Sequence, residues 1–146
     1  TVYANFTLMQ SRANVDQVFD VFRNGRPLQG QANTLLNIGL LFTEPHTRIG
    51  FGAFYNRMGN RIAVVGTGAD KFPSIWEQPR SVLDLQITKA VGKRLELRFV
   101  AADVINQPIR WVQIYQNDNR FRADRDQIIR ERIRGVNFML SAIVKL

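Results

Sequence analysis

Hydrophobic and polar residues alternate along six segments of the chain. An alternation with a period of two residues is typical of a β-strand, in which successive side chains project from opposite faces. The pattern therefore predicts six strands. They span residues 1–9, 34–42, 48–57, 82–89, 95–104 and 136–146. Because this period is the dominant signal, the sequence predicts an all-β protein with antiparallel strands.

The connections between the predicted strands alternate strictly between long and short. Residues 11–33, 58–81 and 105–129 form long connections, whereas residues 43–47 and 90–93 form short ones. Transmembrane β-barrels have short turns on the periplasmic side and long loops outside. The segments have eight to eleven residues, close to the roughly nine to eleven that a tilted strand needs to cross a bilayer. These features favour a transmembrane barrel over a soluble sandwich, which the alternation alone would fit equally well.

Six strands are too few to close a barrel across a membrane, since the smallest such barrels have about eight. An open sheet edge in hydrocarbon would leave backbone N–H and C=O groups unpaired, at several kcal/mol each. The rest of the wall is therefore expected elsewhere. Either this chain is the C-terminal part of a longer polypeptide, or another chain supplies the missing strands.

Composition excludes several classes of protein. Hydrophobic residues make up 45% and charged residues 22%, which argues against disorder, and no apolar run approaches the ~20 residues of a membrane helix. The absence of cysteine excludes disulfides, thiol catalysis and Cys-ligated zinc. His46, the single histidine, has no second His, no Cys and no paired carboxylates near it in the sequence. Residues 66–68 lack the lysine and helix of a phosphate-binding loop. We therefore expect no catalytic residues, no cofactor and no metal site.

Four motifs occur in order along the chain. They are GRPLQGQ at residues 25–31, YNRMGNRIAVVG at 55–66, WEQPRSVLDLQI at 76–87 and ADVINQP at 102–108. In sequence and spacing they resemble the C-terminal barrel of TonB-dependent outer-membrane receptors of the Bacteroidota type. The resemblance covers nearly the whole chain.

The resemblance implies that residues 1–146 are about six C-terminal strands of a barrel of about 22 strands, located in a bacterial outer membrane. It implies that the plug domain and the TonB box lie outside this chain. The implied function is TonB-dependent uptake of a scarce nutrient such as a metal chelate, a glycan or a peptide, with this chain contributing barrel wall and extracellular loops. The implied partners are the remaining barrel and plug, TonB, membrane lipid, lipopolysaccharide and a surface lipoprotein.

Two alternatives belong to other functional classes. The first is a barrel that serves as a structural or scaffold subunit of a larger outer-membrane complex. The second is a soluble basic β-barrel that binds nucleic acid, with affinity that falls steeply as salt rises. The long strands and the sorted connections disfavour the second alternative, so we expect no nucleic-acid partner.

The last predicted strand runs to the carboxyl end. Members of the family usually end in an aromatic residue with Tyr two positions earlier, where this chain has Leu146 and Val144. The resemblance implies that the terminal strand is the signal that the barrel-assembly machinery recognises. Its candidate residues are Phe138, Leu140, Val144 and Leu146.

Polar residues opposite the apolar faces are expected to line the barrel lumen. If the short turn at residues 90–93 sets the register as its length suggests, Asp84 faces Arg98 and Gln86 faces Glu96. Such a wall would contact the plug or a passing substrate. The simpler interpretation is a cross-strand ion pair worth about 0.2–1 kcal/mol.

The last long connection is rich in arginine. Residues 110–134 hold seven basic and four acidic residues, and arginines at 120, 122 and 125 are interleaved with aspartates at 118, 124 and 126. The partial cancellation of charge favours a solvated loop with internal ion pairs, or contact with lipopolysaccharide phosphates, over nucleic-acid binding. Residues 117–126 also lack the glycine and the bidentate glutamate of an EF-hand calcium loop.

Aromatic and basic residues near the strand ends on the long-connection side are candidates for contact at the outer mouth of the barrel. We expect Trp111 to lie in the girdle at the membrane interface, and Trp76 either there or against a ligand. The full set of candidates is Trp76, Trp111, Tyr115, Arg120 and Arg122.

Overall fold

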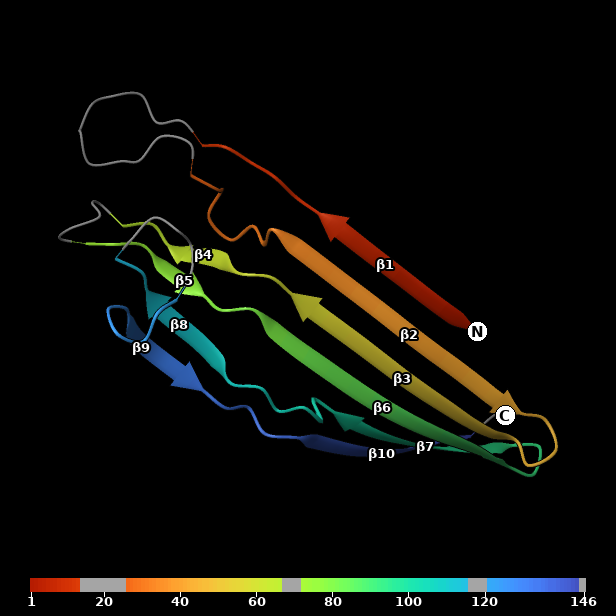
Figure 1. Ribbon diagram of the computed structural model, residues 1–146. Coiled ribbons are helices and arrows are strands. Elements are labelled where there is room, and N and C mark those ends of the chain that lie inside the picture. Colours follow the sequence, from red (N-terminus) through yellow and green to blue (C-terminus); the bar gives the residue numbers. More distant parts are fainter. Residues whose placement is uncertain (14–25, 67–71, 116–120, 145–146) are drawn as a thin grey trace.

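The protein is all-β and its strands are antiparallel, as the sequence predicts (Figure 1). The computed structural model describes residues 1–13, 26–66, 72–115 and 121–144. These residues form ten strands in two sheets, and the sheets do not close into a barrel. Within the described ranges, no helix is long and apolar enough to span a membrane.

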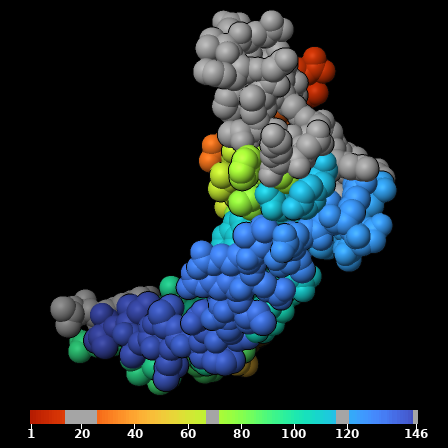
Figure 2. Space-filling view, turned by 90° about the vertical axis from the view of Figure 1, so that its left-hand side faces the viewer, coloured from red at the N-terminus to blue at the C-terminus, as the bar shows by residue number. Residues whose placement is uncertain are grey.

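The larger sheet contains the six predicted strands in the order β1-β2-β3-β6-β7-β10. These are β1 (Val2–Leu8), β2 (Thr34–Glu44), β3 (Ile49–Met58), β6 (Arg80–Val91), β7 (Leu95–Ala102) and β10 (Asn137–Val144). Their ends differ from the predicted ends by at most two residues. Strands β1 and β10 lie at the two edges of this sheet, and Figure 2 shows the curved outline of the molecule.

The smaller sheet contains four strands that the sequence analysis assigned to long connections, and that assignment is wrong. They are β4 (Arg61–Val64), β5 (Ile75–Glu77), β8 (Ile109–Gln113) and β9 (Gln127–Arg132), in the order β4-β5-β8-β9. Each continues a strand of the larger sheet beyond a short break (Figure 1). Gly59, Pro79, Pro108 and Gly135 lie in these breaks and hide the alternation, since glycine and proline interrupt strands.

The register passes through the break between β3 and β4 without a shift. Met58 lies opposite Arg80 in the larger sheet, and three residues further along each strand Arg61 lies opposite Glu77 in the smaller sheet. Side chains two residues apart on a strand share a face. The face that carries Arg57 in the larger sheet therefore carries Arg61 and Glu77 in the smaller one.

The segment between β7 and β8 contains two residues more than the register of β6 and β7 would require. Continuing the β6–β7 register would place Glu77 opposite Ile109, but the structure places it opposite Trp111. The extra residues lie between Ala102 and Ile109, where Asp103 and Asn106 have φ values of 58° and 50°. Because the number of extra residues is even, β8 keeps the same faces as β7.

Both short turns lie at one end of the molecule, and the smaller sheet, whose strands lead into the long connections, lies at the other (Figure 1). In the turn between β2 and β3, the Glu44 carboxylate accepts hydrogen bonds from the backbone N–H (2.6 Å) and the hydroxyl (2.9 Å) of Thr47. Gly92 closes the turn between β6 and β7 with a φ of 65°. The guanidinium of Arg48 donates to the carbonyl oxygen of Gly92 at 2.9 Å and so links the two turns.

A cluster of polar side chains joins the two sheets where β6 begins. The Arg80 guanidinium pairs with the Asp103 carboxylate and donates to the carbonyl oxygen of Gln107 at 3.1 Å. The side-chain oxygen of Gln107 accepts the backbone N–H of Ser81 at 2.7 Å, and Asp84 accepts that of Asp103 at 2.8 Å. These bonds attach the segment with the two extra residues to the neighbouring strand.

We predict that Arg80→Gln lowers the free energy of unfolding by about 3–5 kcal/mol, because it leaves a nearly buried carboxylate without its partner. The Arg80 and Asp103 side chains are only 12% and 10% exposed. The matched control is Arg110→Gln, since the Arg110–Glu131 pair is 49% and 37% exposed and is worth about 1 kcal/mol or less. Chemical unfolding followed by tryptophan fluorescence measures both, and equal losses would contradict the assignment.

Candidate functional site

One face of the larger sheet is apolar from β1 to β10. A single row across it illustrates this, because its members lie opposite one another on successive strands. The row consists of Phe42, Phe51, Ile87, Phe99 and Leu140. Their exposed fractions range from 42% to 74%. The ring of Phe99 also stacks on that of Phe138, with centroids 6.0 Å apart.

The described chain supplies nothing that covers this face. Its buried hydrophobic residues are Ala32, Ile62, Trp76, Ala101, Ile109, Val112 and Ile114, and Ala101 alone among them belongs to the larger sheet. Soluble monomers rarely expose a contiguous apolar patch larger than a few hundred Å². The apolar face therefore requires an apolar environment, either hydrocarbon or another protein.

Polar side chains border the apolar face at both ends. At the short-turn end, Lys89 lies opposite Ile49 and donates to the carbonyl oxygen of Thr47. At the other end, the hydroxyls of Tyr55 and Ser81 are 2.9 Å apart, and Arg57 donates to the Ser81 hydroxyl at 3.3 Å. The apolar region is thus a band across the sheet.

A second polar row lies beyond this border on the same face, in the smaller sheet. Arg61 pairs with Glu77 at 2.8 Å, and Glu77 lies opposite Trp111 on β8. The guanidinium carbon of Arg130 lies 5.2 Å from the centroid of the Trp111 ring, which is cation–π geometry. Trp111 therefore lies where the apolar band gives way to charged residues.

The opposite face of the larger sheet carries polar side chains and glycines. Asn5, Asn37 and Asn56 lie in one row across β1, β2 and β3, and the Asn56 amide donates to the Asn37 side-chain oxygen at 2.5 Å. Gly39 lies under the ring of Tyr3, where an added Cβ atom would be 2.1 Å from the ring. This face is more polar than the apolar face, although Leu41, Phe54, Met139 and Ile143 also lie on it.

The predicted pairing of Asp84 with Arg98 and of Gln86 with Glu96 is wrong. The structure places Thr88 opposite Arg98 and Ala90 opposite Glu96. The register differs because the turn lies later in the sequence than predicted. Strands β6 and β7 extend until Val91 lies opposite Leu95, and Gly92 in the turn has a left-handed conformation.

The four predicted wall residues nevertheless share the polar face, since a shift of four residues preserves the alternation. Arg98 lies 3.5 Å from Glu96 on its own strand, and Gln86 lies opposite Val100. Asp84 accepts the Asp103 backbone N–H instead of an arginine. The four residues thus share one face without the predicted ion pair between Asp84 and Arg98, and their role in lining a lumen stays a prediction.

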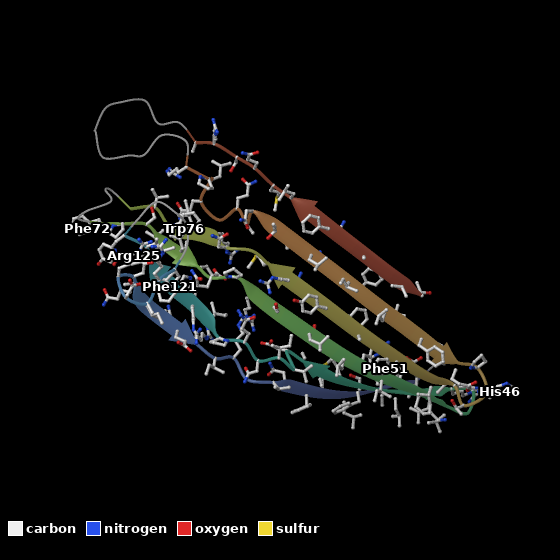
Figure 3. All side chains as sticks on the ribbon, in the orientation of Figure 1. His46, Phe51, Phe72, Trp76, Phe121 and Arg125 are labelled. Carbon is white, nitrogen blue, oxygen red and sulfur yellow. The ribbon has the colours of Figure 1, made fainter. Side chains whose placement is uncertain are left out.

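Trp76 and Trp111 lie on opposite faces of the smaller sheet. Trp76 packs with Ile62, Val112 and Ile114 in the buried core, and Phe121 lies against this cluster. Trp76 also lines a pocket of about 190 Å³ beside the end of β1 and residues 27–33. Figure 3 shows Trp76 and Phe121 at the long-connection end, and Phe51 and His46 toward the short turns.

In the described part of the arginine-rich connection, the Asp126 carboxylate binds the backbone of two other residues. The Asp126 carboxylate accepts the backbone N–H of Tyr115 (3.1 Å) and of Arg122 (2.7 Å), and Arg125 lies 3.6 Å from it. Arg120 and residues 117–119 of the suggested calcium loop lie outside the described residues. In the described part of the chain, no group of three or more His, Cys, Asp or Glu side chains could hold a metal ion.

The terminal strand places its predicted signal residues on the apolar face. Phe138, Leu140 and Val144 are 68%, 74% and 64% exposed on β10. Leu146 lies outside the described residues. Their role as an assembly signal stays a prediction.

No family model, curated protein or solved structure matches this chain.

We predict that the two tryptophans respond differently to truncation. Trp76→Ala removes a ring from the buried core and should cost about 3–5 kcal/mol of stability in the smaller sheet. Trp111→Ala should cost less, because it removes a partly exposed ring and a cation–π contact of about 0.5–2 kcal/mol. Hydrogen exchange of β4 and β5 amides measures both, and faster exchange in the Trp111 variant would contradict this assignment.

Proposed function

We propose that this chain forms a section of the wall of a transmembrane β-barrel in a bacterial outer membrane, of the TonB-dependent receptor type. The observation that carries the proposal is the apolar band, which spans every strand of the larger sheet and has no protein cover among the described residues. A lipid-facing band of apolar side chains flanked by interfacial aromatic and charged residues is typical of such barrels.

The two borders of the band support lipid over a second protein layer. A protein interface has a polar rim around an apolar centre, whereas a bilayer requires two polar borders, one at each end of the strands. Lys89 marks one end, and the Arg61–Glu77 pair with Trp111 marks the other. Tryptophan suits the interface because its ring is apolar and its N–H group is polar.

The opposite face supports a lumen. Asn5, Asn37 and Asn56 form a polar row there, and Asp84, Gln86 and Arg98 continue the polar character on β6 and β7. In a barrel wall this face would contact the plug and the passing nutrient. The sheet edges at β1 and β10 would pair with the remaining strands, which satisfies their backbone groups.

The proposed role is uptake of a scarce nutrient such as a metal chelate, a glycan or a peptide, as the sequence resemblance implies. The wall separates lipid from lumen, and the long connections form the extracellular mouth. The pocket beside Trp76 would open at this mouth. Coupling to TonB would reside in parts of the receptor other than this wall.

We predict that neighbouring residues of β6 differ in their environment. The chain contains no cysteine, so Ile87→Cys and Gln86→Cys each provide one attachment point for a nitroxide spin label. In native membranes, the label at residue 87 should collide several-fold more often with oxygen, which concentrates in lipid, than with a water-soluble nickel complex. The label at residue 86, on the polar face, is the matched control and should not show this preference.

Two results would contradict the proposal. A label at residue 87 that prefers the nickel complex would place the apolar face in water. A label at residue 87 that neither reagent reaches would mean that another protein covers that face.

A second measurement separates a receptor from a scaffold subunit. We expect the detergent-extracted polypeptide that carries this segment to have an intact mass several times that of this chain, with peptides from a plug and a TonB box. An extracted polypeptide without these peptides would contradict the receptor assignment and leave the scaffold.

A further inference from the structure

Three arginines alternate along the edge of the smaller sheet and beyond it. Arg130 and Arg132 lie on β9, Arg134 follows two residues later, and all three side chains are exposed. Trp111 lies beside Arg130, and Ile109 lies opposite Arg132. Residues at alternate positions of a strand project from the same face.

The structure separates these arginines from the acidic residues of the connection. Glu131 pairs with Arg110, and Asp126 lies beside Arg125 and binds two backbone N–H groups. Among the described residues, no carboxylate lies within ion-pair distance of Arg130, Arg132 or Arg134. The interleaved charges of the sequence therefore do not cancel on this strand.

Arg130 and Arg132 lie on the face that carries the apolar band, and Arg134 follows them in the break before β10. Trp111 shares its face with Glu77 and Arg61, and that face continues the apolar face of the larger sheet. The same strand continues through Gly135 into β10, where Phe138 and Leu140 are exposed on the band. Arg134 precedes Phe138 by four residues, about 13 Å along an extended strand and less across a tilted one.

We propose that Arg130, Arg132 and Arg134 bind the phosphate groups of an outer-leaflet membrane lipid whose acyl chains lie along Phe138 and Leu140. This inference rests on the proposed membrane location. Guanidinium groups bind phosphate through two parallel N–H···O bonds, and the row presents three of them directly above apolar side chains. A lipid matches that order of charge and hydrocarbon, whereas nucleic acid or free phosphate would use the charges alone.

The test compares two lipids on the detergent-purified protein by native mass spectrometry. The probes are lipid A with two phosphates and the same lipid without phosphates. We expect the triple variant R130Q, R132Q, R134Q to lose at least tenfold in affinity for the phosphorylated lipid and to bind the other lipid unchanged. The control variant K89Q, K93Q, R94Q removes three positive charges from the short-turn end and should retain the selectivity.

Three outcomes would overturn the inference. Equal losses in the two variants would show that net charge alone attracts the lipid. Displacement of the lipid by equimolar inorganic phosphate would show a site for the free anion. Loss of a copurifying polypeptide or nucleic acid instead of lipid would identify a different partner.

The proposed wall and the lipid site can fail separately. The spin labels at residues 86 and 87 report the wall in both the parent protein and the triple variant. Unchanged label environments combined with unchanged lipid selectivity would reject the arginine site and retain the barrel.

Discussion

The ladder register is the constraint on which the rest of the structure depends. A slip of one residue in any strand pair would exchange its two faces, and would bring Asn37 or Gln86 onto the apolar band. The register instead preserves the faces from the short turns, through the strand breaks and into the smaller sheet. The apolar band, the polar wall, the separation of the two tryptophans and the arginine row all follow from this continuity.

The two sheets obtain their stability in different ways. The smaller sheet has a buried core around Trp76 and Val112, together with the nearly buried carboxylate of Glu77. The larger sheet has long ladders and almost no buried hydrophobic side chains of its own. Its side chains gain their hydrophobic stabilisation from whatever covers the band. The polar cluster around Arg80 lies at the boundary between the two sheets.

The six long strands and their faces could be predicted from the sequence, because a period of two is a local property. The four short strands could not, since three to six residues beside a glycine or a proline carry little alternation. The Asp84 pairing failed because the turn is centred on Lys93, two residues later than predicted, with Gly92 in a left-handed conformation. The opposite faces of Trp76 and Trp111 depend on register across the breaks. The alternation of Arg130, Arg132 and Arg134 can be read from the sequence. The sequence does not show that the nearby acidic residues Asp126 and Glu131 bind other groups.

The two extra residues between β7 and β8 determine which changes of length this wall tolerates during evolution. A strand that gains or loses an even number of residues retains its faces, whereas an odd change exchanges them. Loss of one residue between Ala102 and Ile109 would turn Trp111 toward the core side and Val112 toward the outside. An odd change that preserves the fold therefore needs a compensating β-bulge, as at the register shifts between Ile62 and Val64 and between Trp111 and Val112.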